Sequence, residues 1–159
     1  MQADQQTISR LETLSTEQRN PESMGLSSWT TLELLRCINR QDQTVAVRVA
    51  DVLGDIAKAV DLIAQRMQQG GRMVYVGTGT SGRLGYMDAA ECPPTYGVSA
   101  DTVIGIIAGG RDAAFESIED AEDDFDSCVK QMKEKGFCGK DVCVGLSASG
   151  SANCVKGAL

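Results

Sequence analysis

Residues 72–95 read RMVYVGTGTSGRLGYMDAAECPPT, and this stretch decides the fold. An apolar, β-branched run over 73–76 ends in a glycine-rich turn over 77–82, and a helix-forming segment begins at Arg83. A strand, a tight turn and a helix in this order direct backbone N–H groups and the positive end of the helix dipole at one point, which suits phosphate. Three hydroxyl groups in the turn add hydrogen-bond donors: Thr78, Thr80 and Ser81.

A second copy of this arrangement lies near the end of the sequence. Residues 142–150 (VCVGLSASG) align with residues 74–82 (VYVGTGTSG) as V-x-V-G-x-x-x-S-G. Because both candidate strands end in a loop with serine and glycine at matched offsets, we expect the two loops to border one crevice. Chance similarity between two short strand–turn units is the alternative interpretation.

Composition argues against several classes of function. The chain has 159 residues, of which 42% are hydrophobic, and no apolar run approaches the ~20 residues of a membrane span. The net charge is -7 and aromatic residues make up 4%, which disfavours a nucleic-acid partner, because such binding needs a basic face and stacking rings. The polar N-terminus lacks an apolar secretory core, so we expect a cytoplasmic protein.

Cysteine and histidine usage argues against a metal site. The six cysteines show no C-x-x-C spacing and the chain has no histidine, so we expect neither a metal nor another cofactor. The thiols are expected to be reduced and mostly packed in the interior. Without histidine, acid–base chemistry near neutral pH falls to carboxylates, Lys, Cys or Tyr.

The N-terminal part is predicted to be an arm followed by helices. Residues 1–27 form the arm, in which Pro21 forces extended backbone on the residue before it. Thr30-x-x-Glu33 is a capping box, which predicts a helix to about Asn39.

Apolar residues then recur every three or four positions over 45–67, which predicts one long helix or two, ended by Gly70-Gly71. We therefore divide the chain into an N-terminal arm with helices that pack on the core, residues 1–68, and a core domain, residues 69–159.

Strands and helices alternate in the core domain. The predicted elements are strands over 72–76, 102–107 and 141–145, a helix over 82–91 that Pro93-Pro94 ends, and a helix over 112–134. The strands are apolar on both faces, as in a parallel sheet covered by helices, so the fold class is α/β, a three-layer αβα sandwich of the flavodoxin-like type. Right-handed crossovers bring all three glycine-rich turns to the carboxyl edge of the sheet, where ligands bind. The sequence stops early in the third crossover helix, which predicts a truncated chain; a domain closed by three strands is the alternative.

The glycine turn also satisfies the dinucleotide fingerprint, as Gly77-x-Gly79-x-x-Gly82. A dinucleotide site needs an acidic residue at the carboxyl end of the second strand, where this chain has Ala108-Gly109-Gly110. Asp101 lies at the opposite end of that strand. The density of hydroxyl groups instead favours a phosphate monoester over a pyrophosphate.

With these residues identified, the chain resembles the N-acetylmuramic acid 6-phosphate etherases, which have the sugar isomerase (SIS) fold, over nearly its whole length. Two motifs are specific to that family, Thr16-Glu-x-x-Asn-Pro21 and Glu91-Cys-Pro-Pro-Thr95. The other matching segments are 38–42, 77–83, 106–110 and 119–123.

This resemblance implies cleavage of the D-lactyl ether of N-acetylmuramic acid 6-phosphate, giving N-acetylglucosamine 6-phosphate and D-lactate, in the recycling of peptidoglycan. It implies Glu91 as the proton donor and Glu122 as the second catalytic carboxylate, for which the base is the preferred role. It also implies a homodimer whose site is completed across the interface. The substrate- and phosphate-binding residues are then Thr78, Gly79, Thr80, Ser81, Gly82, Arg83, Ser147, Ser149 and Gly150.

On the residues alone, both glutamates have a structural interpretation. Glu122 lies in an acid-rich run over 116–126, which is typical of a solvated helix face. Glu91 is equally suited to a structural role as a cap at the end of its helix, which the following Pro93-Pro94 makes rigid. A helix that begins at Arg83 also places Glu91 roughly 12 Å along its axis, which favours a site completed by a partner subunit.

Two departures from the family support other functions. After Ser149-Gly150 the family carries Arg-Thr-Pro and an aromatic residue, whereas this chain has Ser-Ala-Asn-Cys, and Ser27 stands where the family usually has Asp. The second interpretation is therefore a non-catalytic sugar-phosphate regulator similar to the glucokinase regulatory proteins, or an inactive etherase fragment. A phosphosugar isomerase is the third. Retention of Glu91 and its motif favours the enzyme.

Overall fold

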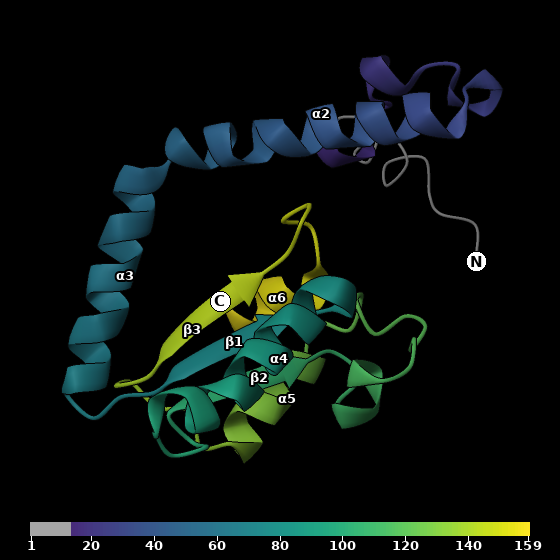
Figure 1. Ribbon diagram of the computed structural model, residues 1–159. Coiled ribbons are helices and arrows are strands. Elements are labelled where there is room, and N and C mark those ends of the chain that lie inside the picture. Colours follow the sequence, from purple (N-terminus) through teal and green to yellow (C-terminus); the bar gives the residue numbers. More distant parts are fainter. Residues whose placement is uncertain (1–13) are drawn as a thin grey trace. The chain divides into compact units, whose positions relative to one another are not determined.

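A computed structural model describes residues 14–159 of this chain (Figure 1). The first part of the expected arm, residues 1–13, lies outside the described residues. The chain divides after Val60 into two compact units, which we describe one at a time. The expectation that the N-terminal segment packs on the core domain stays a prediction.

The N-terminal unit begins with three short 3-10 helices, η1 (Ser15–Glu17), η2 (Pro21–Ser23) and η3 (Leu26–Ser28). Two α-helices follow, α2 (Thr31–Ala50) and α3 (Leu53–Gln68), the second of which continues into the core unit. As expected, Asn20 has extended backbone before the proline, and its side chain caps η2 by accepting a hydrogen bond from the N–H of Glu22.

The capping box at the start of α2 is confirmed. The Thr30 N–H donates to Glu33 Oε2 at 2.7 Å, and the Glu33 N–H donates to Thr30 Oγ1 at 3.3 Å. The predicted end near Asn39 is wrong: α2 continues to Ala50, because no glycine or proline occurs between Asn39 and Ala50. The second periodic segment therefore belongs partly to α2 and partly to α3, and the predicted glycine end holds: Gly70 has a left-handed φ of 83° just after α3.

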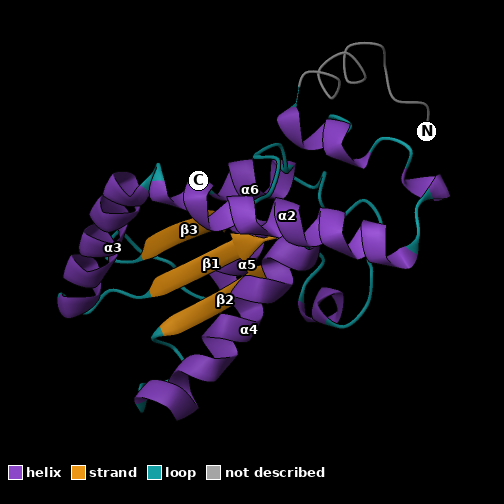
Figure 2. Ribbon diagram, turned by 45° about the horizontal axis from the view of Figure 1, so that its top comes forward, coloured by secondary structure: helices purple, strands orange, loops and turns teal. Residues whose placement is uncertain are grey.

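The core unit is built on a parallel sheet of three strands in the order β2-β1-β3 (Figure 2). The strands are β1 (Met73–Gly77), β2 (Val103–Ile107) and β3 (Val142–Leu146). Helix α4 (Gly79–Tyr96) covers one face, and α5 (Ser127–Glu134) and α6 (Asn153–Ala158) cover the other (Figures 1 and 2). The predicted α/β three-layer fold is thus observed.

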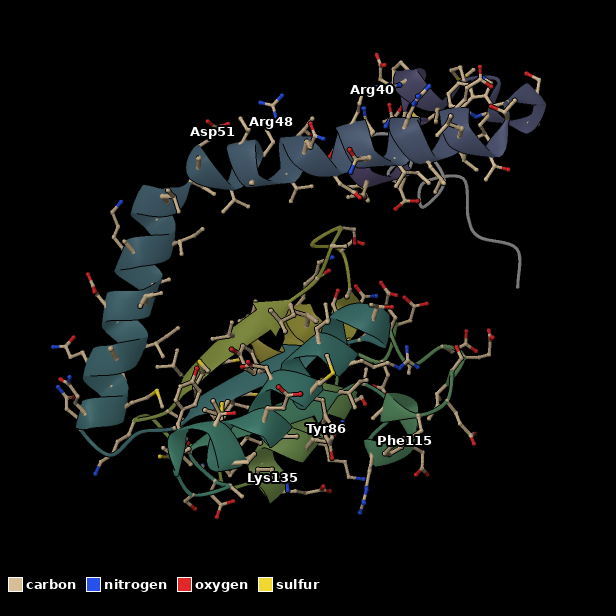
Figure 3. The ribbon with its side chains drawn as sticks, in the orientation of Figure 1. Arg40, Arg48, Asp51, Tyr86, Phe115 and Lys135 are labelled. Atoms are coloured by element: carbon tan, nitrogen blue, oxygen red, sulfur yellow. The ribbon has the colours of Figure 1, made fainter. Side chains whose placement is uncertain are left out.

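Alternate strand residues supply the two halves of the core. On the α5 and α6 side, valines and isoleucines of β1 and β2 pack with thiols and apolar groups of the helices: Val74, Val76, Ile104, Ile106, Cys128, Met132, Cys154 and Val155. On the other side, the space above Gly105 is taken by Tyr86 of α4, because a Cβ at Gly105 would lie 2.6 Å from Tyr86 Cα (Figure 3). Absence of a side chain there lets α4 approach the sheet closely.

All six cysteines are free thiols, and four of them are buried. Cys128 is fully buried on α5. Burial, with the neighbouring Cys154 thiol as a lesser cause, raises the pKa of Cys128 to about 12. A thiol in this state is protonated at neutral pH and acts as a small apolar side chain.

An ion pair fixes the amino end of the sheet. Asp141, just before β3, accepts hydrogen bonds from Arg72 N at 2.8 Å and Arg72 Nε at 3.1 Å through one oxygen, and from Arg72 Nη2 at 2.7 Å through the other. The same guanidinium donates to the carbonyls of Lys135 and Gly136, so it joins β1, β3 and the end of α5. The Asp141 side chain is 2% exposed, and these bonds to Arg72 hold its pKa well below the usual range.

Two predicted helices are wrong in extent. The helix predicted to end at 91 runs through Pro93 and Pro94 to Tyr96, where Gly97 ends it with a left-handed φ of 67°. Each proline removes one backbone N–H, but the buried side chains Ala89 and Cys92 keep this last part of α4 packed on Val103 of β2.

The helix predicted over 112–134 is instead a 3-10 helix, η4 (Arg111–Ala114), followed by turns, and α5 starts only at Ser127. Like charges one turn apart destabilise a helix over the acidic run. Asp124 also accepts the N–H groups of Asp126 and Ser127 at 3.0 and 3.1 Å, which favours a turn there.

Candidate functional site

The three glycine-rich turns begin at one edge of the sheet. In the register of the strands, Gly77 of β1 lies beside Ile107 of β2 and Leu146 of β3. The turns that follow these residues therefore start at the same level, at the carboxyl edge, as the sequence predicted. Ligands of open parallel sheets bind at this edge.

The turn after β1 is held tight by a pair of glycines. A Cβ on Gly77 would lie 2.7 Å from Gly82 Cα, and the Gly82 N–H donates to the Thr78 carbonyl at 3.0 Å. Gly79 has a left-handed φ of 52°. Thr78 is the N-cap residue of α4, but its side chain makes no capping hydrogen bond. The first N–H groups of α4 lack an acceptor within the helix, so this end is suited to an anion.

A cavity of about 240 Å³ lies beside this turn. It is lined by three of the predicted phosphate-binding residues, by Glu122 and by the segment that follows β2: Thr78, Gly79, Arg83, Ala108, Ala113, Glu116, Ser117, Ile118, Glu119, Asp120, Ala121 and Glu122. Pockets for small ligands generally measure about 300–1,000 Å³. The cavity is therefore large enough for part of a sugar phosphate.

Arg83 fixes one wall of the cavity. Its Nε donates to the carbonyl of Ala114 at 3.2 Å and its Nη2 donates to the carbonyl of Glu116 at 2.8 Å. These bonds tie the segment after β2 to α4, and Phe115 between the two acceptors is 77% exposed at the surface (Figure 3). A guanidinium carries five N–H donors, so Arg83 retains donors for an anionic ligand.

Of the two predicted catalytic carboxylates, Glu122 lines the cavity and Glu91 does not. Glu122 lies in a turn, and its backbone carbonyl accepts a hydrogen bond from the N–H of Cys154 at 3.1 Å. Its expected place deep in a helix is thus wrong. Glu91 lies on α4, eight residues past Arg83, so it lies about 12 Å further along the helix axis. Both side chains are exposed, and one chain does not bring them together.

The exposed face of α4 that carries Glu91 also carries two apolar side chains, together with Asp88. Leu84 and Met87 are 57% and 54% exposed, and Glu91 follows them at the spacing i, i+3, i+7, which places all three on one face of the helix. Thr80 of the turn lies on the same stripe, one turn before Leu84.

The serine loop after β3, residues 147–151, lies at the same edge but does not line the cavity. Within it, Ser147 Oγ accepts the Gly150 N–H at 3.0 Å and Ser149 Oγ accepts the Ser151 N–H at 3.1 Å. The bond between Glu122 and Cys154 joins the loop's far end to the cavity wall. That both loops grip one ligand stays a prediction.

The sequence did not single out the apolar and polar lining residues after β2, among them Ala113, Ser117 and Ile118. The signal for them was the Gly109-Gly110 turn, where both residues have left-handed φ, 85° and 77°. Within residues 14–159, no group of three acidic, cysteine or histidine side chains is placed to hold a metal ion, and no helix is both long and apolar enough to cross a membrane.

Comparison with known proteins gives one family and several relatives. Residues 55–159 match the family described as the glucokinase regulatory protein N-terminal SIS domain. The chain is 51% identical over 149 residues to an N-acetylmuramic acid 6-phosphate etherase of Aeromonas hydrophila subsp. hydrophila, which covers 94% of this chain and 50% of that protein. Proteins with the same name from Actinobacillus pleuropneumoniae serotype 7 and Clostridium beijerinckii are each 48% identical, over 99% and 94% of this chain. The chain spans about half the length of these relatives.

Proposed function

Because this chain belongs to the family of the glucokinase regulatory protein N-terminal SIS domain and is similar over nearly its whole length to N-acetylmuramic acid 6-phosphate etherases, we propose that it binds a sugar phosphate and takes part in cleaving a D-lactyl ether. The observation that carries the proposal is the cavity at the carboxyl edge of the sheet, where the β1 turn, Arg83 and Glu122 meet. The substrate is N-acetylmuramic acid 6-phosphate, and the setting is the cytoplasmic recycling of peptidoglycan.

The phosphate group is bound by the turn after β1. The unpaired first N–H groups of α4, over residues 79–81, lie at the positive end of an 18-residue helix, and the hydroxyls of Thr78, Thr80 and Ser81 add donors. Gly77 and Gly82 bring the turn and the start of the helix close together, which leaves room for phosphate oxygens at the backbone. Arg83 contributes positive charge at the cavity wall.

Two carboxyl groups carry the chemistry. In the open-chain sugar, the C2 proton is acidic because it is α to the aldehyde, and a carboxylate base removes it. The C3–O bond to lactate then breaks, a carboxylic acid protonates the departing oxygen, and water adds to the double bond at C3 to give N-acetylglucosamine 6-phosphate. We assign the base to Glu122, which lines the cavity, and the acid to Glu91. Such positioned acid–base groups contribute typically about 10²–10⁴-fold in rate.

A homodimer completes the site in this proposal. Glu91 lies about 12 Å along α4 from Arg83, outside its own chain's cavity. It shares an exposed face with Leu84 and Met87, and exposed apolar side chains are typical of contact surfaces. We infer that this face meets the partner subunit and delivers Glu91 to the partner's cavity.

The direct test is release of D-lactate from N-acetylmuramic acid 6-phosphate. The purified protein is expected to release it, and Glu91→Gln or Glu122→Gln, which change one oxygen to an amide, are expected to abolish it. Glu134→Gln, at the end of α5 and away from the cavity, is the matched control. Absence of lactate with the wild-type protein would rule out the enzyme.

Mixing the two inactive variants tests the shared site. In a dimer that places Glu91 of one subunit with Glu122 of the other, a mixed dimer has one intact site, so random mixing restores about a quarter of wild-type activity. If both glutamates came from one subunit, mixing would restore none.

A second function is favoured by one observation, namely that the cavity of a single chain lacks Glu91. The chain would then be a non-catalytic sugar-phosphate regulator; the family that it matches is described as a domain of a regulatory protein, the glucokinase regulatory protein. Saturable binding of the sugar phosphate without lactate, unchanged by Glu91→Gln, would favour this function.

A further inference from the structure

Lys156 of α6 is a half-buried cation bonded to a neutral group. Its Nζ donates to the backbone carbonyl of Ser151 at 2.6 Å. Among the ion pairs within residues 14–159, none includes Lys156. An ammonium group has three N–H donors and the carbonyl takes one. Two donors and a full positive charge therefore remain at the serine loop.

The hydroxyl groups of the serine loop are arranged as donors. Ser147 Oγ and Ser149 Oγ each accept a backbone N–H of the loop, from Gly150 and Ser151. Ser149 Oγ and Ser151 Oγ lie 2.6 Å apart, so one of these hydroxyls donates to the other. A hydroxyl has one O–H to donate, so the O–H of Ser147 and one O–H of the Ser149–Ser151 pair are left for a ligand.

We propose that Lys156 and the O–H groups of the serine loop form an oxyanion subsite, and that Lys156 pairs with an oxyanion of the bound sugar. The proposal rests on the proposed function and identifies a further binding residue for it. Arg83, the cation on the other side of β1, already donates to two carbonyls, whereas Lys156 gives one bond to one carbonyl. The backbone bond between Glu122 and Cys154 joins α6, the helix that carries Lys156, to the turn whose Glu122 lines the cavity.

The substrate offers two oxyanions, the 6-phosphate and the lactyl carboxylate, which share the chemistry that an ammonium and hydroxyl donors recognise. Three ligands separate them: N-acetylglucosamine 6-phosphate has only the phosphate, N-acetylmuramic acid has only the carboxylate, and N-acetylglucosamine is neutral. Titration calorimetry of the purified protein gives the dissociation constant of each.

The variant is Lys156→Gln, which removes the charge but keeps an N–H donor for the Ser151 carbonyl. We expect it to bind the ligand whose oxyanion meets Lys156 about 10- to 100-fold more weakly, the range for a hydrogen bond to a charged group. Binding of the neutral sugar is expected to stay unchanged, and salt is expected to weaken wild-type binding more than variant binding. Lys133→Gln, in the last turn of α5 and exposed, is the matched control. Lys156→Arg, which keeps the charge, should restore most of the affinity.

A selective loss for the phosphate ligand or for the carboxylate ligand supports the proposal and identifies the oxyanion. Equal affinities of wild type and Lys156→Gln for both charged ligands overturn it, with the proposed function intact. An equal loss for all three ligands also overturns it, because a residue that only shapes the loop acts on charged and neutral sugars alike. If the wild-type protein binds none of the ligands, both this inference and the proposed function fail.

Discussion

Replacing Gly82 by alanine should separate α4 from the sheet at the turn after β1. A Cβ on Gly82 would lie 2.8 Å from the carbonyl carbon of Gly77 and 2.8 Å from Ile107 Cγ1, whereas carbon atoms in favourable contact are about 3.5–4.0 Å apart. The first turn of α4 must therefore move outward by roughly 1 Å. Insertion of a methyl group into a packed site of this kind costs about 1–3 kcal/mol.

The measurement is the free energy of unfolding in urea, where a shift of the midpoint at constant slope reports stability alone. Gly139→Ala is the control, because that glycine has no atom within 4 Å of its added Cβ and no left-handed φ; its change should stay within about 0.5 kcal/mol. Gly82→Ala should also weaken binding of the sugar phosphate, since the N–H groups of the turn move. A stability loss no larger than that of the control would refute the close approach of turn and strand.

Two further changes test the ion pair at the amino end of the sheet and the arginine that ties the segment after β2 to α4. Asp141→Asn leaves the Arg72 guanidinium without its carboxylate and should lower the free energy of unfolding by about 3 kcal/mol, as expected for breaking a buried pair. Because the hydrogen bonds from Arg72 depress the pKa of Asp141 in the folded state, its contribution is complete above the ordinary pKa of an aspartate, about 3.9, and is lost as the pH falls below that value. Acid unfolding that is identical in wild type and Asp141→Asn would contradict this. Arg83→Met removes two hydrogen bonds to the segment after β2 and should speed amide hydrogen exchange at Phe115 and Glu116, whereas unchanged exchange there would show that the arginine does not anchor the segment.

The sequence was sufficient to predict the sheet and the edge at which its three glycine-rich turns begin. Apolar, β-branched runs that end in glycine indicated three parallel strands, and each end of these strands lies within one residue of the predicted range. The reason is that a strand buried on both faces has a strong local signal. The glycines at positions 77 and 82 were also identified from the sequence. Only glycine permits the observed close approach of the turn and the helix at these positions.

The sequence did not predict the fold of the segment after β2 that lines the cavity. Residues 115–126 are acidic at spacings that resemble a helix, but their fold depends on like-charge repulsion and on side-chain bonds such as those of Asp124. The C-terminal end of α4 was also predicted wrongly. Its prolines suggested an end at Glu91, whereas burial of Cys92 and the left-handed Gly97 carry the helix further. For α4 tertiary packing outweighed the local pattern, whereas in the acidic run local charge repulsion and turn-forming side-chain bonds outweighed it.

The most direct test of the account is a titration of the protein with N-acetylglucosamine 6-phosphate, followed through the backbone amide resonances of Gly79, Thr80 and Ser81. We expect these three resonances to shift saturably, and to stay in place when N-acetylglucosamine without phosphate is added. Resonances that do not move with the phosphorylated sugar, or that move only at residues remote from the carboxyl edge of the sheet, would contradict a phosphate site at this turn.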